Sequence, residues 1–266
     1  MCNNQQRYIG FLNTPHLWKN VPIKGLQQFS MVPTQIPFHT VVAKNMRLGK
    51  LVERFVSQQL QHDSRLKLLA ENLIISKNKR TIGELDCLFT KDGQPYHLEV
   101  VYKFYLYDSS VGTSEIDHWI GPNRKDSFTE KLDKLKTKQL PLLYRDETKP
   151  TLKQFNLEAN HIKQCVCFKA QLFIPYGLKN HTFKHINPNC IVGYYYKLKE
   201  VSQLTHCKFF IPKKLDWLSK IDIQINWLTF KEFTPLLQVL LEQKRAPMVW
   251  IKTPKGHTKK GFVVWW

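Results

Sequence analysis

The sequence between residues 82 and 107 reads Ile-Gly-Glu-Leu-Asp-Cys-Leu-Phe-Thr-Lys-Asp-Gly-Gln-Pro-Tyr-His-Leu-Glu-Val-Val-Tyr-Lys-Phe-Tyr-Leu-Tyr. Both halves are rich in β-branched and aromatic residues, as strands are. Between them stands Asp92-Gly93, a dipeptide typical of the tight turn in a β-hairpin. The stretch therefore predicts two antiparallel strands joined at that turn.

Polar side chains gather on one face of this predicted hairpin. Side chains two residues apart on a strand share a face. In the first strand that rule groups Glu84 with Asp86, and in the second it groups Glu99 with Lys103. Once the strands pair, Asp86, Glu99 and Lys103 are predicted to form a single polar patch.

This combination of residue types favours a metal-assisted reaction on phosphate. Two carboxylates in a half-buried site repel each other, so one takes up a proton unless a cation lies nearby. Mg²⁺ suits such a site because it is held by one or two carboxylates together with substrate phosphate. The cation lowers the pKa of water, and a neighbouring lysine stabilises charge that develops on the phosphate. The alternative interpretation is an amphipathic hairpin whose charged face is simply solvated.

The hairpin resembles the core of the PD-(D/E)XK nuclease superfamily, through Gly83-Glu84-Leu85-Asp86 and His97-Leu98-Glu99-Val100-Val101-Tyr102-Lys103. More narrowly, the chain resembles an uncharacterised bacterial family of unknown function assigned to that superfamily. This likeness runs from Leu48-Gly49 through Trp119-Ile120-Gly121-Pro122-Asn123 to Lys260-Gly261-Phe262-Val263-Val264, so it spans most of the chain.

The resemblance implies a restriction-endonuclease-like fold and a Mg²⁺-dependent nuclease in which Mn²⁺ substitutes for Mg²⁺. By the match of motifs, Asp86 and Glu99 are implied to bind the metal. The lysine departs from the superfamily pattern, because Val101 occupies its usual position and Lys103 lies two residues further along the same face. Lys103 is the implied catalytic lysine, and its shift leaves open a nuclease fold that binds nucleic acid without cleaving it.

An amphipathic helix is predicted over residues 43–61. Its apolar residues recur at helical spacing and form one arc: Leu48, Leu51, Val52, Phe55, Val56 and Leu60. Glu53 lies at the edge of that arc. On pattern alone it is equally a surface glutamate, but the resemblance implies that a glutamate on this helix reaches the metal, usually through water.

A second helix is predicted from Ser127 to Leu140. Ser127-Phe128-Thr129-Glu130 fits a capping box at its start, and Pro141 stops it. Gln139 falls on the stripe that faces inward, where a polar amide needs a partner. The resemblance implies that a glutamine borne on this helix completes the nuclease site.

Several basic and amide side chains are candidate contacts to nucleic acid. They stand in the turn before the hairpin, in the polar loop after it, and along the second helix: Lys79, Arg80, Asn123, Arg124, Lys131, Lys134 and Lys138. Beside a nuclease site, such residues suit a track for phosphates. The simpler interpretation of each is a solvated side chain.

The charge of the chain agrees with a polyanionic partner. Forty Lys and Arg against twenty-one Asp and Glu give a formal net charge of +19 and a pI of about 9.7. A field of that sign attracts nucleic acid by counterion release. We therefore expect nucleic acid as the partner, and the resemblance implies DNA, although a basic soluble protein of another function has the same composition.

The element pattern predicts an α/β protein in three parts. Residues 1–42 hold four prolines, which oppose long helices, and scattered aromatics that pack on the body. Residues 43–175 follow the order helix, three strands, helix, strand that the superfamily core implies. Residues 176–266 read as a smaller α/β extension, which includes a strand at 222–227.

No run of eighteen apolar residues predicts a membrane span, and the first residues lack the apolar region of a secretory signal. Six cysteines without a disulfide-like pattern are typical of reduced thiols, so a cytoplasmic location is expected. Cys165 and Cys167 raise a zinc interpretation with downstream histidines, but a Cys-x-Cys within an apolar strand is more often core.

Three functions follow from these patterns. The first is a metal-dependent nuclease acting on DNA. The second is a nucleic-acid-binding protein that keeps the fold without the cleavage. The third is an interaction module whose charged patch is solvated and holds no metal.

Overall fold

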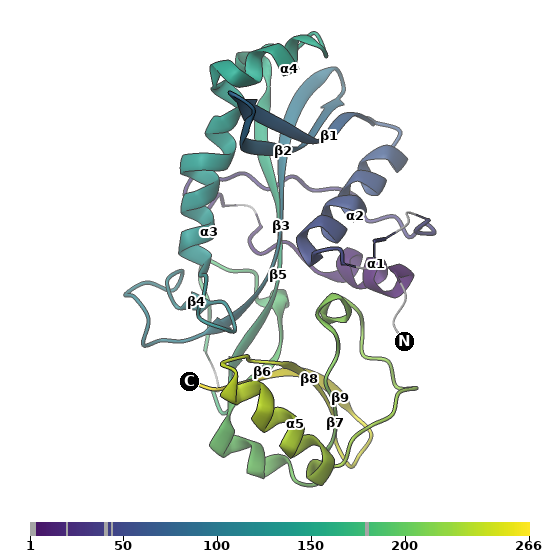
Figure 1. Cartoon of the computed structure of the whole chain (residues 1–266), viewed down its shortest axis with the longest axis vertical. Coiled ribbons are helices and arrows are strands. Elements are labelled where there is room, and N and C mark those ends of the chain that lie inside the picture. The colour runs from purple at the N-terminus through teal and green to yellow at the C-terminus, as the bar shows by residue number, and fades with distance from the viewer. Residues whose placement is uncertain (1–3, 20, 40–41, 44, 179–180) are drawn as a thin grey trace. The chain divides into compact units, whose positions relative to one another are not determined.

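The computed structural model describes residues 4–19, 21–39, 42–43, 45–178 and 181–266. Within these residues, a mixed sheet of nine strands is flanked by helices, which confirms the predicted α/β class (Figure 1). The strands are β1 (Leu66–Lys77), β2 (Arg80–Lys91), β3 (Gln94–Tyr107), β4 (Trp119–Ile120), β5 (Lys163–Pro175), β6 (Ile191–Lys197), β7 (Lys208–Phe210), β8 (Met248–Lys252) and β9 (Thr258–Val264). Their order in the sheet is β1-β2-β3-β5-β6-β9-β8-β7, and β4 pairs with β3.

The α-helices are α1 (Asn4–Asn13), α2 (Leu48–His62), α3 (Phe128–Lys134), α4 (Lys149–Lys153) and α5 (Phe230–Glu242). A π-helical turn, η1 (Leu135–Gln139), and a 3-10 turn, η2 (Leu140–Tyr144), extend α3. Further 3-10 turns are η3 (Asp146–Thr148), η4 (Ala159–His161), η5 (Pro188–Cys190), η6 (Leu198–Leu204) and η7 (Lys214–Trp217).

The predicted hairpin is present, with its turn at Asp92-Gly93. Both residues have positive φ, 50° and 79°, as the tight turns of hairpins require. The antiparallel ladder between β2 and β3 runs from the Lys91–Gln94 pair to the Cys87–Leu98 pair. Beyond Cys87, β2 stays paired with β1 only, so the strands that carry Asp86 and Glu99 separate just where those residues stand.

The chain divides into two compact units whose segments alternate in sequence. The site unit comprises residues 16–102 and 130–169, and the C-terminal unit comprises residues 1–15, 103–129 and 170–266. This division differs from the predicted one at residues 42 and 175. The reason is that β3 and β5 are long strands, and each continues from one unit into the other.

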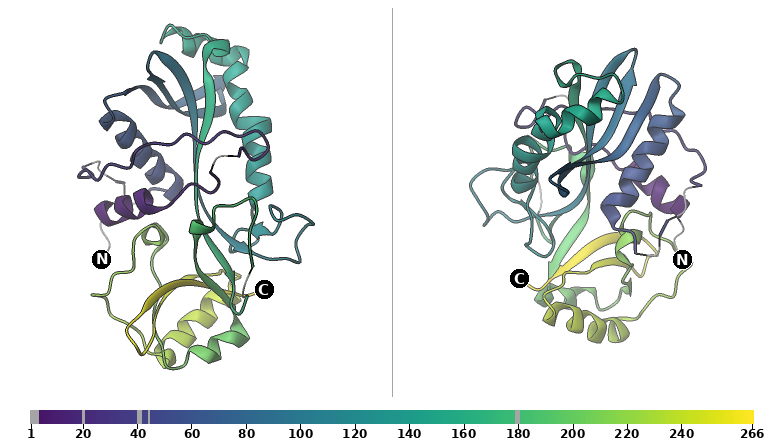
Figure 2. Two further views of the ribbon diagram at one scale, coloured as in Figure 1. Left: turned by 180° about the vertical axis from the view of Figure 1, so that it is seen from behind. Right: turned by 45° about the horizontal axis from the view of Figure 1, so that its top comes forward.

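In the site unit, α2 and α3 lie on opposite sides of the strands (Figures 1 and 2). Helix α2 buries the predicted apolar arc against them, with Leu51, Phe55 and Leu60 fully enclosed. It begins at Leu48, later than the predicted residue 43, and residue 44 lies outside the described part. The 3-10 turn η2 closes the other side with Leu142 and Leu143.

Residues 1–42, in which the prolines oppose long helices, nevertheless form the ten-residue helix α1 over residues 4–13. No proline interrupts the chain before Pro15, and Tyr8 and Phe11 supply a buried face. Further on, Phe29 packs against the rings of Phe89 and Tyr96. Residues 1–3, 20, 40 and 41 of this segment lie outside the described residues.

The C-terminal unit has its own core, built on β6–β9 and α5. Phe209 and Phe233 stack at its centre, with ring centroids 4.2 Å apart. Thr229 and Glu232 form a capping box at the start of α5. The predicted strand at 222–227 is wrong: this segment is irregular and Ile223 is largely exposed, and the isolated bridge to Phe209 of β7 is formed by Leu228, one residue beyond the segment.

Candidate metal centre

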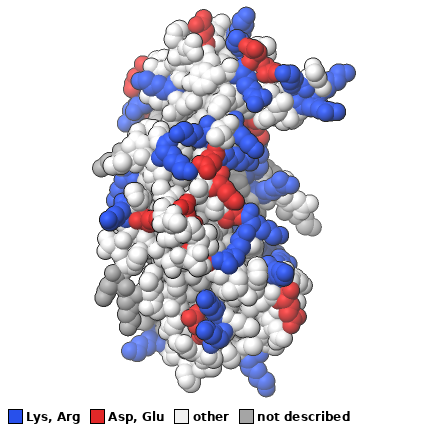
Figure 3. Space-filling view, turned by 90° about the vertical axis from the view of Figure 1, so that its left-hand side faces the viewer, with Lys and Arg blue, Asp and Glu red and all other residues white. Residues whose placement is uncertain are grey.

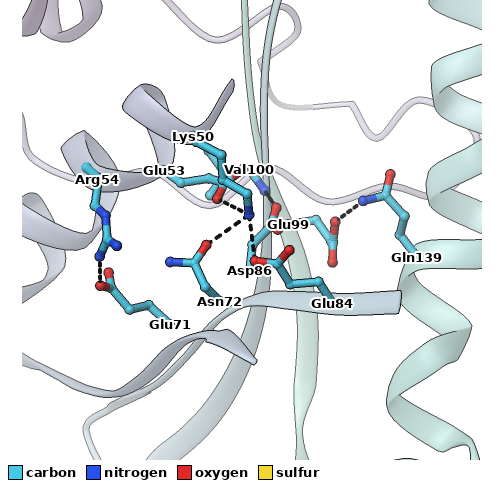
Figure 4. A network of polar contacts seen from close by, with 10 residues as sticks. All are labelled: Lys50, Glu53, Arg54, Glu71, Asn72, Glu84, Asp86, Glu99, Val100 and Gln139. Carbon is cyan, nitrogen blue, oxygen red and sulfur yellow. Dashed lines mark hydrogen bonds and ion pairs between the residues drawn. The ribbon is translucent and has the colours of Figure 1, made fainter. Parts of the chain in front are cut away.

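Two elements of the site unit present carboxylates to one another. On β2, Glu84 and Asp86 lie two residues apart and share a face. On α2, Lys50 and Glu53 lie one turn apart and share another face. Figure 4 shows these four side chains meeting where α2 approaches the strand.

The carboxylates of Glu53, Glu84 and Asp86 each offer an oxygen, and these three oxygens all lie within 4.8 Å of one another. Asp86 is the deepest member, with 8% of its surface exposed. Oxygen ligands from several carboxylates are what hard divalent cations such as Mg²⁺ and Mn²⁺ prefer. The donor set therefore fits the cation that the sequence analysis expected.

Asp86 is held in an environment that disfavours its charge. Its Oδ2 accepts one backbone hydrogen bond, from Val100 N at 2.8 Å. Burial, followed by the negative charges of Glu99 and Glu53, raises the pKa of Asp86 from its ordinary 3.8 to about 8. Burial likewise raises the pKa of Glu53. Carboxylates with raised pKa values need either protons or a cation at neutral pH.

Lys50 supplies a positive charge to this cluster. Its Nζ donates to Glu53 Oε2 at 2.7 Å, to Glu84 Oε1 at 2.5 Å and to Asn72 Oδ1 at 3.0 Å. Although partial burial opposes the charge, these two carboxylates raise the pKa of Lys50. Asn72 stands in β1 with a positive φ of 53°, a conformation unusual for a residue within a strand.

Glu99 belongs to a different network, and it points toward Gln139 rather than into the cluster (Figure 4). Gln139 Nε2 donates to Glu99 Oε2 at 2.5 Å, and Lys131 Nζ donates to Gln139 Oε1. The helix reaches Glu99 at the π-helical turn η1, where Leu140 N bonds Leu135 O. Single π-helical turns often occur at functional sites.

The other oxygen of Glu99 faces His97, and the tautomer of this histidine is determined by its neighbours. Gln164 Nε2 lies 2.7 Å from Leu140 O, which requires the amide nitrogen at that position. The same nitrogen lies 3.1 Å from His97 Nδ1, so Nδ1 accepts. His97 Nε2 therefore carries the hydrogen and donates it to Glu99 Oε1 over 3.2 Å.

The predicted patch of Asp86, Glu99 and Lys103 is corrected by these contacts. Glu99 is fully buried and is bonded to Gln139 and His97, because β2 and β3 have separated at this level. The ammonium of Lys103, in the C-terminal unit, forms an ion pair with Asp126. The structure gathers Glu53 and Glu84 around Asp86 instead.

The candidate nucleic-acid contacts fall into two groups. Asn123 and Arg124 hold the C-terminal unit together: Asn123 Oδ1 accepts from Ala246 N, and Arg124 pairs with Asp108 and lies 4.2 Å from the ring centroid of Trp266. The others lie in the site unit. Lys79, Arg80, Lys134 and Lys138 are exposed, and Lys131 is half-buried. Basic side chains are prominent on the α3 side of the molecule (Figure 3).

A family model described as "Domain of unknown function (DUF1853)" matches residues 9–264. The chain belongs to this family. Comparison with curated proteins gave no match, and comparison with solved structures gave none either. The predicted likeness to an uncharacterised family is thus confirmed, and the family description names no activity.

Sequence reasoning missed two side chains of the candidate centre of this DUF1853 chain. Glu84 shares its strand face with Asp86, so the period of two already contained the signal. Lys50 precedes Glu53 by one helical turn, which also placed the two side chains together.

Cys165 and Cys167 are buried in β5 and burial raises their thiol pKa values, as expected for core cysteines. No described helix of this DUF1853 chain is long and apolar enough to cross a membrane.

In the absence of divalent cations, the DUF1853 chain should lose stability as pH rises from about 4 to about 8. Between these values the unfolded chain has released the Asp86 proton while the folded chain retains it, so a rising pH favours unfolding. The slope contributed by one proton is at most about 1.4 kcal/mol per pH unit. Urea unfolding in EDTA across this range measures it, and a curve parallel to that of an Asp86→Asn variant would contradict it.

Proposed function

We propose that this protein is a metal-dependent nuclease that hydrolyses phosphodiester bonds of DNA. The observation that carries the proposal is the cluster of Glu53, Glu84 and Asp86, whose oxygens lie within 4.8 Å of one another on two elements of the site unit. A cluster of one buried and two half-buried carboxylates costs stability unless a cation or protons offset its charge. The all-oxygen donor set selects Mg²⁺ or Mn²⁺ over softer metals.

The order of elements supports a restriction-endonuclease-like core. Helix α2 is followed by the strands β1, β2 and β3, and then by α3 and β5. The short strand β4 precedes α3, and the short helix α4 with several π- and 3-10 turns lies between α3 and β5. The order of the main elements is the one that the sequence resemblance implies. It brings the helix that bears Glu53 and the strand that bears Asp86 to one place, as a shared cation site requires.

The side chains take the following roles in this proposal. Asp86, Glu53 and Glu84 hold the cation, which when bound lowers the pKa of water and neutralises charge on the scissile phosphate. Glu99 and Gln139, with Lys131 behind them, form a second polar wall beside it. Lys103 has Asp126 as its partner, so its contribution as the catalytic lysine depends on release from that pair.

One observation favours a second candidate, a nucleic-acid-binding protein without cleavage. Lys50 already neutralises part of the carboxylate cluster, and both lysines near the motif are engaged in ion pairs. A cluster stabilised by its own lysine does not require a metal. In this case the charge of +19 would still hold DNA by counterion release.

The test is a cleavage assay on linear, nicked, branched and single-stranded DNA, with RNA beside them, in Mn²⁺ and in Mg²⁺. We expect cleavage of at least one DNA substrate that stops when EDTA is added. Salt-sensitive binding to the same DNA without cleavage in either metal would contradict the nuclease function and support the second candidate, a nucleic-acid-binding protein. Absence of both binding and cleavage would contradict both functions.

Charge reversal on the exposed face of α3 and its π-helical extension η1 should weaken DNA binding. Lys134→Glu and Lys138→Glu each remove one basic side chain that is exposed. If each contacts a phosphate, the slope of log affinity against log salt should decrease by about 1 for each lysine. Fluorescence anisotropy at several salt concentrations measures it. Lys149→Glu, on α4 and paired with Asp146, is the matched control and should change binding less.

A further inference from the structure

Lys50 occupies the position where the carboxylate cluster presents its oxygens. Two of its three acceptors, Glu53 Oε2 and Glu84 Oε1, belong to the residues that would hold a divalent cation. The third acceptor is Asn72 Oδ1, on β1, the strand that pairs with β2. These oxygens come from α2, β2 and β1, so three separate elements converge on one ammonium group (Figure 4).

The coordination of this ammonium is complete. A lysine ammonium has three N–H donors, and three oxygens at 2.5 to 3.0 Å accept them. An ordinary surface ion pair has one partner and contributes little. The arrangement around Lys50 instead resembles a cation held by oxygen ligands, with nitrogen in place of the metal.

The side chain of Lys50 is nevertheless partly open to solvent. It is 44% exposed, whereas that of Glu53 is only 12% exposed. The stem of Lys50 therefore reaches the cluster from the solvent side, and this is the side to which we expect it to move when it is displaced. A metal ion bound to the same Glu53 and Glu84 oxygens would lie close to the ammonium, and like charges so close repel each other, so the two cations compete for these oxygens.

We propose that Lys50 is the resident cation of this centre and that a divalent ion must displace it. The released ammonium is then available to a phosphate of the substrate, so metal and DNA bind more tightly together than separately. Lys50 thereby sets the metal affinity and couples it to substrate. This inference rests on the proposed metal site but not on cleavage.

The experiment is a calorimetric Mn²⁺ titration of the wild type, Lys50→Met and Lys50→Gln, in the absence of DNA. Because both variants lack the competing ammonium, we expect them to bind Mn²⁺ about 10-fold more tightly or better, the typical size of one coupling free energy. Arg54→Met is the matched control, since Arg54 is a similarly exposed cation on α2 whose partner is Glu71, outside the cluster. The control should bind Mn²⁺ like the wild type.

A second measurement checks the role of the released ammonium. Lys50→Met should cleave DNA more slowly at saturating Mn²⁺, although it binds the metal more tightly. Unchanged or weaker Mn²⁺ binding by the Lys50 variants, an equal gain in Arg54→Met, or no Mn²⁺ binding by any of these proteins would overturn the inference. Tighter binding by the Lys50 variants in a protein that never cleaves would refute the nuclease and leave the role of Lys50 standing.

Discussion

An Asp86→Asn protein should lose Mn²⁺ binding and metal-dependent cleavage, the latter by roughly 10³-fold or more. Asp86 is the most buried of the three clustered carboxylates, so its loss removes the ligand that is furthest from water. The asparagine keeps the shape and can still accept the hydrogen bond from Val100 N. The variant therefore removes a charge rather than a packing element. Calorimetry with Mn²⁺ and a cleavage assay measure the two effects.

The same variant should be more stable than the wild type in EDTA at neutral pH. Burial and the neighbouring Glu99 and Glu53 raise the pKa of Asp86 to about 8, which means that its charged form destabilises the folded state. At neutral pH the folded wild type must therefore hold a proton on Asp86 that the unfolded chain has released, and a neutral amide avoids this cost. A gain in stability together with a loss of function is the expected result when a residue is retained for a ligand rather than for the fold.

Asp63→Asn is the matched control for this experiment. Asp63 follows α2 in the same unit, and its pKa is lowered to about 2 by hydrogen bonds from Arg65, the reverse of Asp86. Its replacement should leave Mn²⁺ binding unchanged and should not stabilise the protein. If Asp86→Asn cleaves DNA as the wild type does, or if both variants respond alike, the assignment of Asp86 to the cation site is wrong.

His97→Leu should lower the free energy of unfolding by about 3 kcal/mol, the largest stability effect we expect from a single polar side chain here. His97 and Glu99 are both fully buried. Removal of the imidazole deprives Glu99 Oε1 of its donor and leaves Gln164 without one of its two acceptors. A buried carboxylate that loses a hydrogen-bond donor is costly, because no water replaces it. Urea unfolding measures the change.

Two further variants separate this network from a general loss of packing. Glu99→Gln in the His97→Leu background should recover part of the stability, since it removes the uncompensated charge. His161→Leu is the matched control: His161 and Glu158 also form a histidine–glutamate pair, but both are largely exposed and lie 3.8 Å apart. Its effect should be close to zero. An equal cost for His97→Leu and His161→Leu would show that the buried network contributes no stability.

Local periodicity was enough to predict the hairpin and its turn. Asp92-Gly93 determines the turn. Because side chains two residues apart on a strand share a face, Glu84 and Asp86 can be placed together without any tertiary information. The spacing of one helical turn likewise relates Lys50 to Glu53. These features depend only on neighbours within one element, so the sequence reveals them directly.

The partners of Glu99 and Lys103 could not be predicted in this way. Strand alternation assumes that β2 and β3 remain paired, but their ladder ends at Cys87 and Leu98. Where the strands separate, the direction of Glu99 depends on Gln139, forty residues later, which reaches it through a π-helical turn that no periodicity predicts. Lys103 forms its ion pair with Asp126, which stands in the loop before α3. Contacts between distant segments decided both cases.

The alternation of segments between the two units has a consequence for biosynthesis. The chain crosses from one unit to the other after Pro15, Tyr102, Thr129 and Lys169. The segments of each unit therefore leave the ribosome at different times. Residues 1–15 are synthesised long before residues 170–266, with which they form the C-terminal unit. Termination after Pro15, Tyr102 or Thr129 leaves both units incomplete, so it should give protein that is degraded rather than a functional fragment. Termination after Lys169 retains every segment of the site unit but lacks residues 170–266 of the C-terminal unit.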